Sequence, residues 1–393
     1  MTRKNWICAQ LGAREHYAVP RALYANNALS LFLTDSWVRN QSFLSSLRPF
    51  RRLADRFHVE LSDAPVKSAT LHSLILELSL RRTSHPSSWE SILARNQWFQ
   101  AWVSKILYRL QDPDHCFFSY SYTALSCLRI CRNNGWPSVL GQIDPGYEEE
   151  RLVIKEHLRY PSIVSNWRPA PPAYWEDWHQ ELRYTDHIIV NSQWSHDALV
   201  RQGVPPSKLH TIPLVYTSRQ QPTGFLTSNY RLSRSFQLLF IGTICLRKGI
   251  ARLLEAMDIL SNYDIFLTLV GPSEIDSLSW SHLSNVRWIG SVPRSTVASL
   301  YRSAHAMILP TISDGFALTQ LESLAYGCPV IASTHCGAVI RDGINGWILP
   351  SIEPVEIAET ILRARATIDS LCYPLSAPSS DLVSLSNALA NLP

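Results

Sequence analysis

The stretch FQLLFIGTICLRKGIARLLEAMDILSNYDIFLTLVG, residues 236–271, decides the fold class of this chain. Its first part, 236–242, is a short apolar run that ends in glycine, which is typical of a strand buried in a parallel sheet. A second apolar run follows at 264–271. Between them, 248–260 places five apolar side chains on one face of a helix: Ile250, Leu253, Leu254, Met257 and Leu260. Strand, helix and strand in this order predict a parallel sheet covered by helices.

The same alternation extends in both directions from this unit. Towards the C-terminus we expect helices opened by Pro293 and over 316–327, and strands at 285–292, 305–310 and 328–333. In the first half we expect Ser192 as a helix N-cap, and strands at 5–12, 116–122, 137–144, 187–192 and 209–214. The chain is therefore predicted to be α/β, with two doubly wound, Rossmann-like domains.

A polar stretch with proline and glycine but no periodicity, 217–235, indicates a linker between the two halves. We therefore expect an N-terminal domain at 1–216, a C-terminal domain at 236–372, and a tail with a short apolar helix at 373–393. Open parallel sheets bind ligands at the carboxyl ends of their strands. Two such domains that face each other predict a ligand cleft between them.

Composition excludes several classes of protein. The 393 residues are 46% hydrophobic and only 17% charged, which excludes a disordered chain. No run approaches the roughly 18 apolar residues of a spanning helix, and residues 1–12 become polar too early for a signal peptide, so we expect a cytoplasmic protein. None of the eight cysteines forms a CxxC pair, which favours reduced, buried thiols over disulfides or a zinc framework.

The net charge of +4 is unevenly distributed. Residues 1–110 contain 15 basic and 7 acidic side chains, so they carry +8 and the remainder carries −4. Arg48, Arg52 and Arg56 would lie on one face of a helix. Such a face suits peripheral contact with the inner face of an anionic membrane, or is simply a solvated surface. No basic pattern interleaved with aromatic residues occurs, so we expect no nucleic-acid partner.

The residues PTISDGFALTQLESLAYGCPVIAS, 310–333, contain the first candidate site. A loop with Asp314 and Gly315 follows a strand, and we expect the next helix to begin near Phe316. The unpaired amides and the dipole of a helix start form an anion site suited to a phosphate. Carboxylates repel a phosphate, so Asp314 and Glu322 would bind hydroxyl groups. The alternative is that Asp314 caps the helix and Glu322 is solvated.

Arg247 and Lys248 form the second candidate site, in the loop between the strand at 236–242 and its helix. Two cations at a helix N-terminus oppose the dipole unless an anion binds there as well. An anion held by both side chains and nearby amides removes this conflict, whereas two solvated cations are the alternative. Both loops follow strands of one sheet, so we expect them to converge on a ligand with at least one phosphate.

The order and spacing of these motifs resemble the group 1 glycosyltransferases, the retaining GT-B enzymes of glycosyltransferase family 4. The resemblance covers residues 185–365 well and 1–150 weakly. One family motif is an acidic residue followed, after seven other residues, by Glu. It corresponds here to Asp314 and Glu322. Further family motifs correspond to Ala325-Tyr326-Gly327-Cys328-Pro329-Val330-Ile331-Ala332, Arg247-Lys248-Gly249 and Asp342-Gly343-Ile344-Asn345-Gly346.

This resemblance implies transfer of a sugar from a nucleotide-diphosphate-sugar donor to a hydroxyl of a glycan, lipid or small-molecule acceptor. Such transfer retains the anomeric configuration and needs no obligatory metal or other cofactor. Arg247 and Lys248 are implied to hold the diphosphate and stabilise the leaving group, with Asp314 on the transferred sugar and Glu322 on the ribose. The other implied donor-binding residues are Gly12, Gly242, Gly315, Phe316, Ala317 and Leu318.

The chain departs from the family pattern at four places. Asp314 stands where the family usually has Glu, Ala317 where Gly is common, and Thr243 where many members have Arg. The stretch HCGAVIRDG, 335–343, lacks the Glu that the family usually has after the glycines there. The shorter side chain of Asp314 and the absence of a cation at 243 affect residues implied to touch the donor.

The N-terminal domain is implied to bind the acceptor. Arg14 and His16 follow its first strand, and they are candidates for donor or acceptor contact or else ordinary surface residues. Many family members carry a His after the strand that 137–144 resembles, whereas this chain has Gln142 and Asp144 there. Asp144 is a candidate general base, or else a turn-forming residue before Pro145.

Two alternatives to a transferase remain. A protein with a degenerate site would bind a nucleotide sugar without turnover, and an epimerase on the same architecture would convert the donor without an acceptor. The sequence contains no GxGxxG motif, which argues against a dinucleotide-dependent redox enzyme. Asp112-Pro113-Asp114 spells a metal-binding DxD, but a proline inside it indicates a turn.

Overall fold

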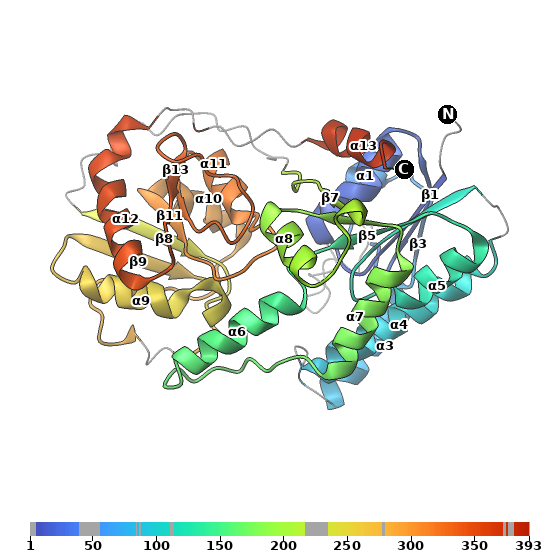
Figure 1. Cartoon of the computed structure of the whole chain (residues 1–393), viewed down its shortest axis with the longest axis horizontal. Coiled ribbons are helices and arrows are strands. Elements are labelled where there is room, and N and C mark those ends of the chain that lie inside the picture. The colour runs from blue at the N-terminus through green and yellow to red at the C-terminus, as the bar shows by residue number, and fades with distance from the viewer. Residues whose placement is uncertain are drawn as a thin grey trace.

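The computed structural model describes residues 5–38, 56–83, 85, 88–110, 114–216, 235–276, 280–371, 375 and 381–392. These residues form two parallel β-sheets that lie side by side and are covered by helices (Figure 1). The predicted α/β class with two doubly wound domains is confirmed.

The first sheet has the strand order β3-β2-β1-β4-β5-β6-β7, so the order reverses between β1 and β4. Its strands are β1 (Asn5–Gln10), β2 (Leu29–Thr34), β3 (Val66–Ser68), β4 (His115–Tyr120), β5 (Ser138–Gln142), β6 (His187–Val190) and β7 (Leu209–Thr211). Its helices are α1 (Ala18–Ala25), α3 (Thr70–Thr83), α4 (Trp89–Leu107), α5 (Leu125–Asn134), α6 (Tyr147–Arg159), α7 (Pro172–Tyr184) and α8 (Gln193–Arg201), with 3-10 turns η1 (Arg14–Tyr17), η3 (Val59–Leu61) and η4 (Pro206–Lys208). Cys8 of the central strand lies opposite Phe32 on one side and Phe118 on the other.

The second sheet has the strand order β10-β9-β8-β11-β12-β13, with the reversal between β8 and β11. Its strands are β8 (Phe236–Ile241), β9 (Ile265–Val270), β10 (Val286–Trp288), β11 (Ala306–Leu309), β12 (Val330–Ala332) and β13 (Gly346–Ile348). Its helices are α9 (Ile250–Ile259), α10 (Arg294–Ser303), α11 (Thr319–Ala325) and α12 (Pro354–Thr367), with 3-10 turns η5 (Leu246–Lys248) and η7 (Ile368–Ser370). The order reversals put the loops after β1, β8 and β11 where doubly wound sheets bind ligands.

Two segments pack on the sheet to which they do not belong by sequence. The last helix, α13 (Leu382–Ala390), lies against α1, where the Ser386 hydroxyl donates to the carbonyl of Ala22 at 3.1 Å (Figure 1). After α6, the chain joins the second domain, because the amide of Asn166 donates to the carbonyl of Glu274 at 3.0 Å. The two domains are therefore connected by more than the segment at 217–235.

Most predicted elements lie where the sequence indicates, and three strands were missed. The predicted strands at 5–12, 116–122, 137–144, 187–192 and 209–214 correspond to β1, β4, β5, β6 and β7, and those of the second half correspond to β8–β12. The predicted N-cap is confirmed, since the Ser192 hydroxyl accepts from the Ser195 amide at 3.1 Å. The strands β2, β3 and β13 were not predicted.

The predicted start of a helix near Phe316 is wrong. Ala317 has a φ of 64°, which is left-handed and cannot continue an α-helix, and α11 begins at Thr319. This difference changes which amides point into the loop after β11.

Several other predictions lie partly outside the described residues. These are the linker apart from Ser235, Arg48 and Arg52 of the basic stretch, Asp112 and Pro113 of the DxD, and Cys372. The seven cysteines that the structure describes are free thiols and all are buried, as predicted. Across the part of the chain that the structure describes, no helix is both long and apolar enough to cross a membrane.

Candidate active site

The loops after β8 and β11 pack directly against each other. The Arg247 carbonyl accepts from the Ile312 amide at 2.9 Å and from the Thr311 hydroxyl at 3.2 Å. Gly249 has a φ of 72°, and a Cβ there would lie 2.0 Å from the Pro310 carbonyl oxygen, so only glycine allows this approach. The two candidate sites of the sequence therefore form one site.

Asp314 is at the centre of this joined site. Its carboxylate forms an ion pair with Lys248, and its Oδ2 lies 3.6 Å from Nη1 of Arg247. Its Oδ1 accepts from the amides of Phe316 at 3.1 Å and Ala317 at 3.0 Å. Burial opposes ionisation of Asp314, but the two cations hold its pKa below the ordinary value. Asp314 thus caps the loop and also neutralises the cations implied to hold a diphosphate.

The amides of Phe316 and Ala317 differ from the expectation for a phosphate site. Both donate to Asp314, so in this structure they face a carboxylate rather than the open cleft. Leu318, the next donor-binding candidate, lines the cavity described below. Gly242 directly follows β8 and its amide donates to the Val270 carbonyl at 3.0 Å.

A carboxylate that the sequence analysis missed, Glu149, enters this site from the other domain. It lies in the first turn of α6, and its Oε1 is 3.6 Å from Nη1 of Arg247. Its Oε2 is buried and has no hydrogen-bond partner among the described residues. Burial, then the charges of Asp144 and Asp314, raise the pKa of Glu149 to about 7 against the opposing effect of Arg247. The acidic run Glu148-Glu149-Glu150, which opens a helix at the ligand-binding edge of the first sheet, was the available signal.

Gly315 is held between the two domains. A Cβ at this position would lie 2.1 Å from the carbonyl oxygen of Ile143 in the β5–α6 loop. The Ser195 hydroxyl of α8 donates to the Gly315 carbonyl at 3.4 Å, and the indole of Trp194 donates to the Ser313 hydroxyl at 3.1 Å. The loop after β11 is therefore positioned by contacts from the first domain.

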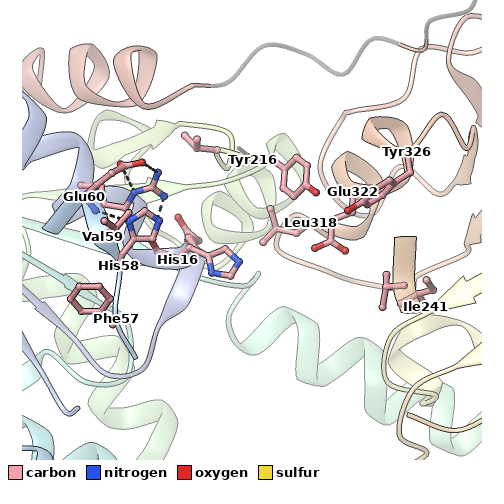
Figure 2. A pocket seen from close by; sticks show the side chains of 14 residues that line it. His16, Phe57, His58, Val59, Glu60, Tyr216, Ile241, Leu318, Glu322 and Tyr326 are labelled. Carbon is pink, nitrogen blue, oxygen red and sulfur yellow. Dashed lines mark hydrogen bonds and ion pairs between the residues drawn. The ribbon is translucent and has the colours of Figure 1, made fainter. Parts of the chain in front are cut away.

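A cavity of about 510 Å³ lies between the domains, next to this loop. Figure 2 shows Leu318, Glu322 and Tyr326 projecting from one side and His16 with His58 from the other. The Tyr301 hydroxyl donates to Glu322 Oε2 at 3.3 Å. Glu322 thus borders a space that both domains enclose, rather than a solvated helix face.

The loop after β1 has an unusual backbone where it meets the cavity. Glu15, His16 and Tyr17 have φ angles of 51°, 50° and 62° in succession, a left-handed conformation that costs roughly 1–3 kcal/mol per residue. Gly12 precedes them with a φ of 84°, and its amide donates to Asp35 Oδ1 at 2.8 Å. Strain of this kind occurs at binding sites, and no turn motif in the sequence indicated it.

The candidates of the first domain differ in position. His16 and Glu15 line the cavity, and burial raises the pKa of Glu15 to about 7. Arg14 is exposed, with its guanidinium 5.9 Å from the centre of the Tyr120 ring. Arg14 does not line the cavity.

Asp144 is bound into its own turn. Its Oδ1 accepts from the Tyr122 hydroxyl at 2.6 Å, the Gln142 amide at 2.9 Å and the Gly146 amide at 2.9 Å. This geometry agrees with the turn-forming interpretation, because three donors already use the oxygen. Among the residues that the structure describes, no group of three or more His, Cys, Asp or Glu side chains could hold a metal ion.

Residues 235–366 match the family model of the glycosyl transferases group 1. This part of the chain belongs to that family. The resemblance inferred from the motifs is therefore confirmed for the group 1 family, over the domain that contains Arg247, Lys248, Asp314 and Glu322.

Curated relatives of this group 1 domain carry glycosyltransferase names. A D-inositol 3-phosphate glycosyltransferase of Catenulispora acidiphila is 28% identical over 224 residues, which are 51% of this chain and 53% of the relative. The chain thus spans about half the length of this curated relative.

Two solved structures align with almost the whole chain. WaaG, a glycosyltransferase involved in lipopolysaccharide biosynthesis, aligns with 98% of this chain and 98% of its own, with 18% identity and a TM-score of 0.59. HepE of Anabaena in complex with UDP aligns with 98% of this chain and 94% of its own, with 14% identity and a TM-score of 0.57. The GT-B fold that the resemblance implied is confirmed.

Proposed function

We propose that this protein transfers a sugar from a nucleotide-diphosphate sugar to an acceptor hydroxyl, with retention of the anomeric configuration. The observation that carries the proposal is the convergence of Arg247 and Lys248 with the loop of Asp314, since the same loop lines the interdomain cavity through Leu318. Two adjacent cations in a loop that packs against this one suit the diphosphate of a nucleotide sugar.

The residues of the site have separate roles in this proposal. Arg247 and Lys248 bind the diphosphate and stabilise the negative charge that develops on it as the bond to the sugar breaks. Glu322, which borders the cavity, accepts hydrogen bonds from the ribose hydroxyls. Once the donor diphosphate has replaced Asp314 as the partner of Lys248, Asp314 accepts hydrogen bonds from hydroxyls of the transferred sugar.

The names of similar proteins support the donor class. HepE of Anabaena was solved with UDP, and the Catenulispora relative is named a D-inositol 3-phosphate glycosyltransferase. We propose the corresponding chemistry for this chain, a nucleoside diphosphate sugar as donor and a hydroxyl of a glycan, lipid or small molecule as acceptor. The reaction needs no resident metal in this proposal, since Arg247 and Lys248 supply the positive charge.

A donor screen followed by turnover measurements tests the proposal. The thermal midpoint is measured with a panel of UDP-, GDP- and ADP-sugars, because a ligand of the folded state raises it. Donor consumption is then compared in the wild type, Lys248→Ala and Glu322→Ala, with Glu148→Gln as a control outside the cavity. Both site variants should lose turnover, and wild-type turnover in both would refute the assignment.

The same incubation separates the alternatives. A transferase releases the nucleoside diphosphate, and its turnover depends on an acceptor or on water. An epimerase changes the sugar of the donor without releasing the nucleotide, which NMR of the incubated donor detects. A degenerate site binds a nucleotide sugar in the thermal screen and leaves it unchanged.

We also propose that the N-terminal domain contacts an anionic membrane surface through α3. Leu71, Ile75 and Leu78 lie on one face of this helix and are 68%, 57% and 57% exposed. Arg81 and Arg82, both exposed, end the helix. An exposed apolar stripe next to cations is typical of helices that lie in a membrane interface. Arg56, from the basic stretch expected to do this, instead pairs with Asp35 at 3.3 Å.

A further inference from the structure

We propose that Glu149 acts as a proton-linked gate of the donor site: its ionised carboxylate competes with the donor diphosphate for Arg247, so that donor binding takes up one proton. This inference rests on the proposed function, since it assigns regulation to the same site. It begins from the geometry of Glu149, which reaches the cations of the second domain from the first turn of α6.

The side chains of the site carry no excess of positive charge. Arg247 faces two carboxylates, with Glu149 Oε1 and Asp314 Oδ2 each 3.6 Å from its Nη1. Lys248 is paired with Asp314. Two cations thus face two carboxylates, and a diphosphate that enters this cluster adds negative charge where no excess of positive charge exists. One carboxylate must lose its charge or move away before the anion binds well.

Of these two carboxylates, Glu149 is the one suited to take up a proton. Asp314 accepts from two backbone amides and pairs with Lys248, and all three contacts favour its charged form. The charged form of Glu149 is favoured by Arg247 at 3.6 Å and by a side-chain hydrogen bond with Ser313, and its Oε2 is buried with no hydrogen-bond partner among the described residues. Burial as the main cause raises its pKa to about 7, so it titrates near neutral pH.

Outside α6 itself, the charged groups around Glu149 come from three segments. Asp144 lies in the loop before α6, Arg247 and Lys248 in η5, and Asp314 in the loop after β11. Its neighbours on α6 are engaged elsewhere: Glu148 with Arg151, and Glu150 with the Trp175 indole. A bound diphosphate adds to the negative charge of Asp144 and Asp314, and it therefore raises the pKa of Glu149 further.

The direction in which donor affinity changes with pH follows from proton linkage. If the pKa of Glu149 rises on binding, the complex holds more protons than the free protein, and the affinity falls as the pH rises through 7. One proton limits the loss to about tenfold between about pH 6 and pH 8. The Glu149→Gln variant, which carries no charge, should bind with the same affinity across this range and more tightly than the wild type at about pH 8.

Isothermal titration calorimetry tests this with the full chain and with UDP-glucose, GDP-mannose and ADP-glucose as probes. The wild type, Glu149→Gln and the matched neighbour Glu148→Gln are titrated at several pH values, each in two buffers of different ionisation enthalpy. We expect proton uptake near pH 7 in the wild type and in Glu148→Gln, and none in Glu149→Gln. The proton count of the wild type needs no variant, so the test survives if Glu149→Gln folds poorly.

The outcomes separate this inference from the proposed function. Binding of a probe with no proton uptake and no pH dependence in the wild type overturns the gate but leaves the transferase proposal intact. Equal pH dependence in the wild type and Glu149→Gln does the same, because another group then titrates. If none of the three probes binds the wild type at any pH tested, the proposed function itself fails.

Discussion

Glu156 and Arg252 form a buried ion pair that joins α6 to α9 of the second domain. Nε of Arg252 donates to Glu156 Oε1 at 2.7 Å, and Nη2 donates to Oε2 at 2.6 Å. Glu156 is 2% exposed and Arg252 is 9% exposed, so both charges are removed from water. The helix that carries Glu149 is thus fixed to the second domain two turns beyond the candidate site.

Replacing Glu156 by Ala should destabilise the protein strongly. The change leaves the buried Arg252 guanidinium with Glu353 at 2.6 Å and the Ile352 carbonyl at 3.5 Å, and breaking a buried pair costs about 3–5 kcal/mol. Arg159→Ala is the matched control, because its pair with Glu353 is exposed and such pairs contribute about 1 kcal/mol or less. Urea unfolding of both variants measures the difference. A loss in Glu156→Ala no larger than in the control would show that α6 is not fixed through this pair.

Gly315→Ala should reduce turnover while the second domain stays folded. The new Cβ would lie 2.1 Å from the Ile143 carbonyl oxygen, so the domains must move apart at the site. A displacement of about 1 Å between reacting groups can cost roughly 100-fold in rate. Ser195→Ala serves as the control, because it removes a contact to the same residue at 3.4 Å and adds no atom. Donor turnover and thermal midpoint are measured for both variants, and undiminished turnover in Gly315→Ala would contradict the interdomain contact.

Stability should depend on pH through Glu149. Its pKa is 4.5 ordinarily and about 7 in the folded protein, so between these values the folded state holds a proton that the unfolded chain has released. The stability of the wild type therefore falls as the pH rises from about 5 to about 8. Glu15 and Glu181, whose pKa values burial raises to about 7, act in the same direction. The thermal midpoint of Glu149→Gln should therefore rise relative to that of the wild type as the pH increases over this range. A difference between the two midpoints that does not change with pH would contradict the assignment.

The apolar face of α3 should be required for binding to anionic vesicles. Replacing Leu71, Ile75 and Leu78 together by Ser removes side chains that are each worth about 1.5 kcal/mol or more when fully buried. We expect sedimentation with vesicles that contain phosphatidylglycerol to fall more than about tenfold. Val355→Ser, at an exposed position of α12, should not change it. Equal binding by the triple variant and the wild type would exclude this face as the contact.

The sequence predicted the part of the site that arises within one sheet. Arg247 and Asp314 follow β8 and β11, which are neighbours in the second sheet, so parallel-strand topology alone brings their loops together. Glu149 was not predictable in the same way. It reaches Arg247 only because α6 packs across the domain boundary, and that packing depends on pairs such as Glu156 with Arg252 that are far apart in sequence.

The missed strands have separate physical reasons. The β2 run LSLFLT at 29–34 is a short apolar run, which periodicity alone does not distinguish from a buried helix segment. The strands β3 and β13 each have three residues, too few for a periodic pattern. The helix start at Phe316 was misplaced because alanine ordinarily favours helix, and nothing local indicates a positive φ at Ala317. The left-handed run from Glu15 to Tyr17 contains no glycine that would have indicated it, because tertiary contacts impose this conformation.

Ala317 offers a direct test of the backbone strain just before the N-terminal end of α11. Its φ of 64° is unfavourable for any residue with a Cβ by about 1–2 kcal/mol, and glycine, common at this place in the family, adopts it freely. Ala317→Gly should therefore leave the protein as stable as the wild type or more stable by up to about 1 kcal/mol. Ala298→Gly, inside α10, should instead lose about 1 kcal/mol, because glycine is a poor helix former. Urea unfolding of the two variants checks the opposite signs, and equal destabilisation would mean that the backbone at 317 is not left-handed.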